Sequence, residues 1–452
     1  MSTPAPERPR RPRRFRRGMY ASRWVPVVVL AASALVVVLP GPRWADLVVV
    51  NGLVLVALGV DVWLAPATGA LQASRTVPPV VSLDRPGTAQ IRLHNPATRP
   101  VRIATREGAG ASAGVRPARQ TLEVEPGSWA EIDEEIAPTR RGVIPIGPLT
   151  VRTAGPLGLG GRQQTLALVD EVKCYPALPG RRQVELRLDR ARMLQSGERS
   201  SAMRGGGGEF DALREYHPDD EFRRINWRAT ARAPKPISNT YREERNQQVL
   251  LLVDTSRMMA GTVGGAPRFE HALDAGIALA ELAGRVGDHV GMTAFAGDVR
   301  VTVGPRSGRS QARRILDVLF NIHPTLDAPN YSRAFGLLLA RYRRRALLVL
   351  LTELADPAAM EGLVAALPML LARHLVVVAA VSDPAVEADA TSVPTGSEEA
   401  YAKAAAAGAL AARAASATRL GMLGVTVVDE PPGELAGALA DQYLTIKSRG
   451  RL

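Results

Sequence analysis

Residues 247–259 read QQVLLLVDTSRMM, and this stretch decides the fold of the second half of the chain. Val249 to Val253 is a short, continuous apolar run, which is typical of a strand buried on both faces of a parallel sheet. The run ends in Asp254, and Ser256 follows two residues later. Ligands of open α/β sheets lie beyond the carboxyl ends of strands, and Mg²⁺ prefers oxygen ligands. The sequence therefore predicts a buried strand that ends in a candidate cation site.

Strand and helix patterns alternate after this run, as in a doubly wound α/β (Rossmann-like) domain. Apolar runs that predict strands lie at 249–253, 289–295, 346–352, 374–381 and 424–428, and an alternating run at 298–303 predicts an antiparallel edge strand. Helical patterns lie near 269–286, 309–320, 330–343, 357–372, 398–420 and 432–443. We expect this domain to span residues 249–445.

A dense mixed-charge motif precedes the predicted strand, within an expected linker region at 180–248. Arginines at 214, 223, 224, 228 and 232 interleave with acids at 209, 211, 215, 219, 220 and 221. The motif is either an ion-pair network that ties the segment to the domain or a docking surface for a partner. We expect Trp227 to be a buried anchor. The candidate interaction residues are Glu209, Arg214, Tyr216, Asp220, Arg223, Arg224, Trp227 and Arg232.

The motif and the strand together resemble the bacterial family catalogued as domain of unknown function 58. The matching residues are Glu209-Phe210, Leu213-Arg214-Glu215-Tyr216, Pro218, Asp220, Arg224-Ile225-Asn226-Trp227, Ala231-Arg232 and Asp254-Thr255-Ser256-Arg257. The resemblance implies a von Willebrand factor A-like domain behind a membrane anchor. It also implies association with a MoxR-type AAA+ ATPase.

The resemblance further implies a Mg²⁺ site built from three loops, in a degenerate form. The tentative ligands are Asp254, Ser256, Asn330 and Glu353. Met258 occupies the third position of the first loop, and its thioether does not suit a hard cation. Asn330 and Glu353 each stand where an aspartate is usual. We therefore expect weak or absent metal binding, with Asp254 held instead by Arg257 or by backbone N–H groups.

Other chemistries find little support in the sequence. The glycines at 205–208 are not followed by a GK[ST] arrangement, so they do not form a P-loop. The single cysteine, Cys174, excludes an intramolecular disulfide and has no basic motif beside it that would mark a nucleophile. A hydrolase that uses Asp254 and Glu353 as paired carboxylates stays open as an alternative, although no substrate logic supports it.

The net charge of +13 is concentrated at the N-terminus, where residues 1–23 hold eight arginines and one acid. Two apolar segments follow, Trp24 to Leu39 and Trp44 to Leu64, joined by Pro40-Gly41-Pro42-Arg43. They predict a hairpin of two transmembrane helices at 24–64, with a cleavable signal peptide as the alternative. Cationic flanks stay in the cytoplasm, so we expect a basic cytoplasmic tail, an inner-membrane hairpin and a cytoplasmic bulk. Nucleic acid is the less favoured partner of the tail.

Residues 75–175 alternate polar and apolar positions between Pro and Gly turns, which predicts a β-sandwich of immunoglobulin-like size. The family resemblance continues at Thr139-Arg140-Arg141-Gly142 and at Pro156-Leu157-Gly158-Leu159. Relatives usually carry an aspartate before that proline, where this chain has Gly155, so we expect a contact to be missing. The expected function is that of a membrane-anchored adaptor or scaffold in envelope or complex assembly. A hydrolase and a structural envelope protein are the alternatives.

Overall fold

The computed structural model describes residues 17–38, 44–182, 184–186, 209–217, 222, 225–242 and 247–449. The chain divides into two compact units, Met1–Ala177 and Leu178–Leu452. The first unit holds an apolar helix pair and a β-sandwich, and the second holds an α/β domain and a small hairpin. Each unit is described by itself below.

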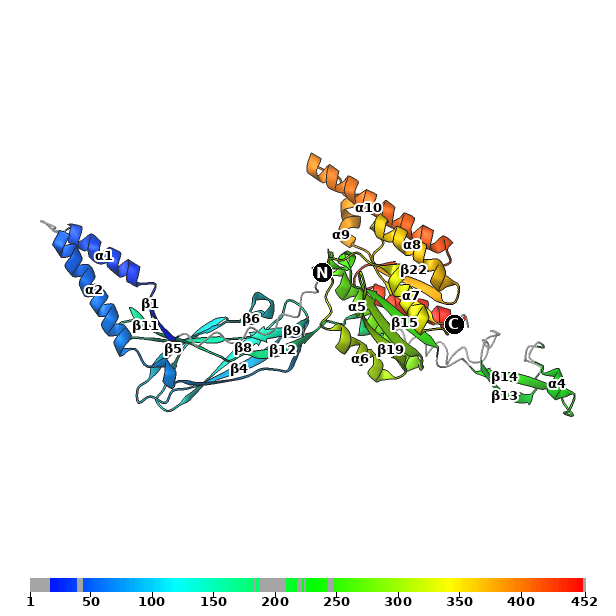
Figure 1. The fold of residues 1–452 in the computed structure, drawn as a ribbon, viewed down its shortest axis with the longest axis horizontal. Coiled ribbons are helices and arrows are strands. Elements are labelled where there is room, and N and C mark those ends of the chain that lie inside the picture. The colour runs from blue at the N-terminus through cyan, green and yellow to red at the C-terminus, as the bar shows by residue number, and fades with distance from the viewer. Residues whose placement is uncertain are drawn as a thin grey trace. The chain divides into compact units, whose positions relative to one another are not determined.

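The helix pair of the first unit consists of α1 (Val25–Val38) and α2 (Trp44–Leu64), which lie side by side (Figure 1). The Asn51 amide Nδ2 donates to Ser33 Oγ at 3.2 Å and joins the two helices. Among the described residues, α2 is the one helix that is long and apolar enough to cross a membrane. Helix α1 has 14 residues, about 21 Å at 1.5 Å per residue, and so falls short of the hydrocarbon thickness.

Three sheets form the β-sandwich of the first unit. Their strand orders are β1-β11-β10-β5-β7, β2-β4-β8-β6 and β3-β12-β9. The strands are β1 (Arg17–Ala21), β2 (Gln72–Thr76), β3 (Val80–Ser82), β4 (Gly87–His94), β5 (Val101–Glu107), β6 (Val115–Arg116), β7 (Arg119–Val124), β8 (Trp129–Ile136), β9 (Gly142–Ile146), β10 (Leu149–Ala154), β11 (Gly160–Leu166) and β12 (Asp170–Tyr175). Alternate side chains of facing sheets, such as Ile91 and Ile103, fill the core between them.

Strand β1 corrects the expectation that residues 1–23 form only a basic tail. Arg17–Ala21 pairs antiparallel with β11, and Ala21 lies opposite Gly160. The segment before the helix pair is therefore an edge strand. The other strands of its sheet follow the helix pair in the chain. Local sequence did not indicate this strand, because its pairing partner lies more than 100 residues later in the chain.

The α/β domain has one six-stranded sheet of order β19-β18-β15-β20-β21-β22. Its strands are β15 (Gln248–Asp254), β18 (His289–Phe295), β19 (Val299–Arg306), β20 (Leu347–Leu351), β21 (Leu375–Val381) and β22 (Thr426–Glu430). All neighbours are parallel except the edge pair β18 and β19. Because the chain runs outward in one direction from β15 and then in the other from β20, the topological switch point lies between these two strands.

Helices cover both faces of this sheet, which is the doubly wound arrangement. On one face α5 (Arg268–Val286), α6 (Arg309–Leu319) and α11 (Leu435–Ser448) pack against Val249, Leu251 and Val253 of β15. On the other face α7 (Tyr331–Arg341), α8 (Pro357–Leu371) and α10 (Ser397–Met422) pack with Leu250 and Leu252. Both faces of β15 are thus buried, as its unbroken apolar run requires. The domain also contains α9 (Pro384–Thr391) and the short η4 (Arg257–Ala260).

The mixed-charge motif forms a separate two-stranded element. Strands β13 (Glu209–Glu215) and β14 (Ile237–Arg242) pair antiparallel, with α4 (Trp227–Thr230) between them (Figure 1). Asn226 caps α4, since its Oδ1 accepts from Ala229 N at 3.0 Å. We refer to these described residues of 209–242 as the β13–β14 hairpin.

Candidate functional site

Asp254 lies at the carboxyl end of β15, beside the switch point. Its side chain is fully buried. One carboxylate oxygen accepts from Ser256 N at 2.8 Å, and the other accepts from Thr352 Oγ1 at 2.6 Å. Thr352 directly follows β20, so the two strands that flank the switch point are joined through this carboxylate.

Asp254 is closed off from solvent, with polar groups around its carboxylate. Burial raises its pKa above the ordinary range, and the hydrogen bonds from Thr352 and Ser256 oppose that rise. Tyr331 OH lies 3.0 Å from Thr352 Oγ1, and burial also raises the pKa of this phenol. Asp254 is therefore the centre of a buried hydrogen-bond network that links β15, β20 and α7.

Glu353 follows Thr352 and pairs with two arginines, of which Arg413 also pairs with Asp429 at 2.6 Å. Its Oε2 lies 2.9 Å from Arg268 Nε of α5, and Arg413 Nη1 of α10 donates to its Oε1. The N–H groups of Leu354 and Ala355 donate to the same Oε1 at 3.0 Å. Only 3% of Glu353 is exposed. The positive charge that a cation would bring to this carboxylate is already supplied by guanidinium groups.

The other two tentative ligands serve as caps of local structure. Asn330 Oδ1 accepts from Arg333 N at 3.1 Å and caps α7, while Ser256 Oγ accepts from Met258 N at the start of η4. Arg257, a suggested partner of Asp254, reaches Asp356 instead, at 3.4 Å. The other expected partner of Asp254 was a backbone N–H group, and Ser256 N is such a donor, at 2.8 Å.

The four tentative ligands thus lie on loops at one edge of the sheet, and each accepts hydrogen bonds from the protein itself. Within the described part of the chain, no group of three His, Cys, Asp or Glu side chains is placed to hold a metal ion. The donor set fits a buried structural network better than an open Mg²⁺ site, which needs several free oxygens. Paired-carboxylate chemistry also lacks a substrate path, because Asp254 and Glu353 are both buried.

The β13–β14 hairpin presents aromatic side chains to solvent. Trp227 is 60% exposed and Phe222 is 68% exposed, and their ring centroids lie 5.5 Å apart in an edge-to-face arrangement. Leu213 on β13 is also exposed. Our expectation that Trp227 is a buried anchor is wrong, because a two-stranded hairpin has no core in which to bury an indole.

The structure describes only some of the charged residues of the motif. Arg214 and Arg232 are exposed, Tyr216 is half-buried, and Lys235 forms an exposed ion pair with Glu215 at 3.0 Å. Asp220, Arg223 and Arg224 lie outside the described residues, and the side chain of Glu209 is not described. An exposed pair such as Lys235–Glu215 contributes little to stability, so the network interpretation gains little support from it.

Sequence reasoning missed Thr352, Arg268, Arg413 and Phe222. Arg413 lies 60 residues from the glutamate it neutralises, and no local pattern marks such a pair. An arginine inside an alanine-rich helix was the available signal, because a charged residue on a helix that packs against a domain needs a partner.

Comparison with known proteins finds a family match for the central part of the chain. Residues 212–395 match the model of the family described as protein of unknown function DUF58, which confirms the resemblance drawn from the motif. Uncharacterized protein Mb1516 of Mycobacterium bovis and uncharacterized protein Rv1480 of Mycobacterium tuberculosis are each 25% identical over 190 residues. Each match covers 42% of this chain and 59% of the relative, so the chain spans about three fifths of their length.

Similar solved structures include BatB from Bacteroides thetaiotaomicron and an aerotolerance-related membrane protein from Bacteroides fragilis. Sequence identities are 16% and 15%, and both TM-scores are 0.29. Each match covers 45% of this chain and 100% of the other. At these TM-scores the likeness supports no conclusion about this chain.

Proposed function

We propose that this chain, with its match to the DUF58 family, is a membrane-anchored adaptor that binds a MoxR-type AAA+ ATPase. In this role it presents a client of envelope or complex assembly to the ATPase, which supplies the energy. The proposal has three parts: an anchor, a binding surface and the absence of a chemical role for the buried acids.

The anchor is the helix pair α1 and α2, inserted as a hairpin. Its support is the pairing of β1 with β11, because these strands precede and follow the pair in one sheet. A chain that enters and leaves a bilayer from the same sheet must do so on the same side. The sequence that precedes the helix pair is rich in arginine, and cationic flanks of membrane spans stay in the cytoplasm, so we assign that side to the cytoplasm.

The binding surface is the exposed aromatic pair of the β13–β14 hairpin, and this observation carries the proposal. Trp227 and Phe222 expose most of their surface on an element that has no core of its own. Tryptophan is among the residues enriched in the energetic centres of protein interfaces, together with arginine. Arg214 and Arg232 are exposed on the same hairpin, so apolar anchors and cations are combined.

The hydrolase alternative is less well supported by the same chain. Asp254 accepts two hydrogen bonds in a closed environment, and Glu353 is shared between Arg268 and Arg413. A general acid or base must reach a proton of the substrate, and neither carboxylate is exposed to do so. A structural envelope role makes no use of the exposed aromatic pair.

Substitution of Trp227 by alanine tests the binding surface. The full chain, purified and immobilised, is titrated with a purified MoxR-type ATPase from the same organism. We expect Trp227→Ala to weaken binding by at least about tenfold, since truncation of an interface tryptophan costs roughly 2 kcal/mol or more.

Trp129→Ala is the matched control. Trp129 lies on β8 of the sandwich, is 55% exposed and packs on one ring, that of His94 at 4.8 Å. It therefore resembles Trp227 in exposure and contact but lies in the other unit. Equal weakening by both substitutions, or no binding by the unaltered chain, would contradict the proposed surface.

A further inference from the structure

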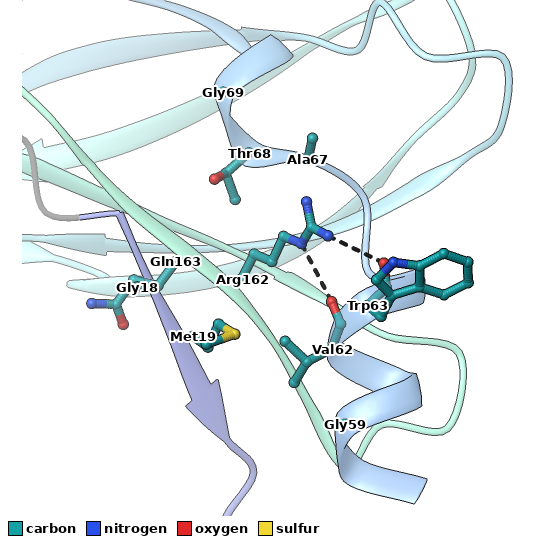
Figure 2. A pocket seen from close by; sticks show the side chains of 10 residues that line it. All are labelled: Gly18, Met19, Gly59, Val62, Trp63, Ala67, Thr68, Gly69, Arg162 and Gln163. Carbon is teal, nitrogen blue, oxygen red and sulfur yellow. Dashed lines mark hydrogen bonds between the residues drawn. The ribbon is translucent and has the colours of Figure 1, made fainter. Parts of the chain in front are cut away.

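One cavity of the first unit lies where helix α2 meets the sandwich. Its volume is about 750 Å³. Met19 of β1, Val62 and Trp63 of α2, and Thr68, Arg162 and Gln163 contribute to its lining (Figure 2). All of these residues belong to the first unit, so the cavity is formed within a single compact body.

The apolar part of the lining is exposed at the end of the candidate membrane span. Met19 is 78% exposed and Trp63 is 75% exposed, and α2 ends one residue after Trp63. Tryptophan side chains are enriched at the level of lipid headgroups. In the anchored protein the cavity therefore lies at the boundary between the bilayer and water.

The polar part of the lining is a positioned guanidinium group. Arg162 Nε donates to Val62 O at 3.3 Å and Nη2 donates to Trp63 O at 3.2 Å, as the dashed lines in Figure 2 show. These carbonyls belong to the last turn of α2, whose partial negative charge favours a cation. The remaining nitrogen, Nη1, takes part in neither bond, and the group keeps its positive charge beside the cavity.

A second arginine lies next to the cavity lining. Arg152 donates to Gln163 Oε1 at 2.7 Å and stacks on the Tyr20 ring at 4.8 Å. The nearby acid Asp61 accepts from Leu157 N and Gly160 N, so its charge is directed into the β10–β11 turn.

We propose that this cavity binds an anionic phospholipid, with the phosphate of the headgroup on Arg162. The glycerol and the first part of an acyl chain then lie along Met19, Val62 and Trp63. A soluble anion would satisfy the guanidinium but leave the apolar wall in water, whereas a lipid matches both. The inference rests on the membrane anchor of the proposed function and adds a specific ligand to it.

Native mass spectrometry of the full chain in mild detergent tests this site. The protein is offered equal amounts of dioleoylphosphatidylglycerol and dioleoylphosphatidylcholine, and soluble glycerol phosphate in a separate arm. We expect about a fivefold preference for phosphatidylglycerol, from one cationic contact near the surface. We also expect glycerol phosphate not to displace the bound lipid. Displacement by glycerol phosphate would overturn the lipid assignment in favour of a soluble anion.

Two pairs of variants localise the lipid. Gly59→Leu fills the cavity and Gly52→Leu is its control, because both glycines lie on α2 and a Cβ at either would meet no atom within 4 Å, but only Gly59 lines the cavity. Arg162→Gln removes the cation, and Arg92→Gln removes an exposed one on β4. The preference should fall several-fold in Gly59→Leu and Arg162→Gln and persist in both controls.

The outcomes separate the anchor from the lipid site. If the full chain fails to float with liposomes, both the anchor and the lipid site are wrong. If it floats but retains the two lipids equally, or if Gly59→Leu and Gly52→Leu behave alike, only the lipid site is wrong. Should Arg162→Gln fail to fold, the glycine pair still decides the question.

Discussion

At the residue scale, two acids at the buried edge of the α/β sheet are held by hydrogen bonds and arginines. Asp254 is bound by Ser256 N and Thr352 Oγ1, and Glu353 by Arg268 and Arg413. An oxygen-rich site that binds Mg²⁺ tightly leaves several carboxylate lone pairs for the ion. Here both acids already take part in hydrogen bonds or ion pairs within the protein, so we expect metal binding to be weak or absent.

Replacement of Asp254 by alanine tests this account. The change leaves Ser256 N and the Thr352 hydroxyl without their buried acceptor, at a cost of roughly 2 to 4 kcal/mol. We expect the melting temperature to fall by several degrees, and millimolar Mg²⁺ or Mn²⁺ to change neither protein in calorimetric titration. Tight metal binding by the unaltered chain that Asp254→Ala abolishes would show that a cation site survives.

A second residue gives a pH-dependent prediction. Glu134 of β8 is 1% exposed, and its Oε2 lacks a hydrogen-bond partner. Burial, reinforced by the charge of Glu107 and opposed by that of Arg75, raises the pKa of Glu134 to about 7. The folded state then binds more protons than the unfolded state between the unfolded pKa and about 7, so stability falls as pH rises through this window.

Glu134→Gln should remove this dependence. At pH 8 the substitution should stabilise the sandwich by on the order of 2 to 3 kcal/mol, because the variant no longer buries an ionised carboxylate at this position. At pH 5 the carboxyl is already neutral in the folded protein, so the substitution should have little effect. Thermal melts of both proteins at the two pH values measure the difference. The same change in melting temperature at pH 5 and pH 8 would refute the buried charge as its cause.

At the element scale, the end of α2 is fastened to the sandwich through Asp61. Its carboxylate accepts from Leu157 N at 2.6 Å and from Gly160 N at 2.8 Å. A Cβ at Gly155 would lie 2.3 Å from Asp61 Oδ1 and from its backbone oxygen. An aspartate before Pro156, as the family resemblance implies, would therefore collide with the Asp61 carboxylate.

Substitutions at this junction should loosen α2 from the sandwich. Asp61→Ala removes the acceptor of two backbone N–H groups, and Gly155→Asp forces a side chain into an occupied space, so each should cost roughly 1 to 3 kcal/mol. We expect faster proteolysis near residues 64–68 in both variants. Gly52→Ala, which meets no atom within 4 Å, serves as the control and should leave the cleavage rate unchanged.

The elements of the α/β domain could be predicted from sequence because each one has the hydrophobic pattern of a helix or of a buried strand. The runs at 289–295 and 374–381 coincide with β18 and β21 to within a residue. Strand β1 could not be predicted, since its five residues show no clear polar and apolar alternation and its partner β11 lies far along the chain. The contacts of Asp61, and that of Arg413 with Glu353, could not be predicted either, because these partners lie 60 or more residues away and no local sequence pattern marks them.

At the scale of the whole molecule, the pairing of β1 with β11 leads to a prediction for the topology of the proposed anchor. Reporters of cytoplasmic and periplasmic location, fused at the N-terminus and at the C-terminus, should both report the cytoplasm, because one sheet holds the segments on either side of the helix pair. Reporters on opposite sides, or an N-terminus removed near residue 40, would contradict the hairpin.

The central claim is that this chain acts on a client only through an ATPase partner. The most direct measurement is the affinity of the full chain, reconstituted in lipid nanodiscs, for a purified MoxR-type ATPase from the same organism. The account predicts a saturable complex in which only the ATPase hydrolyses nucleotide, and loss of that complex in Trp227→Ala but not in Trp129→Ala. Absence of a complex, reproducible binding of nucleic acid alone, or turnover of a substrate by the isolated chain would contradict it.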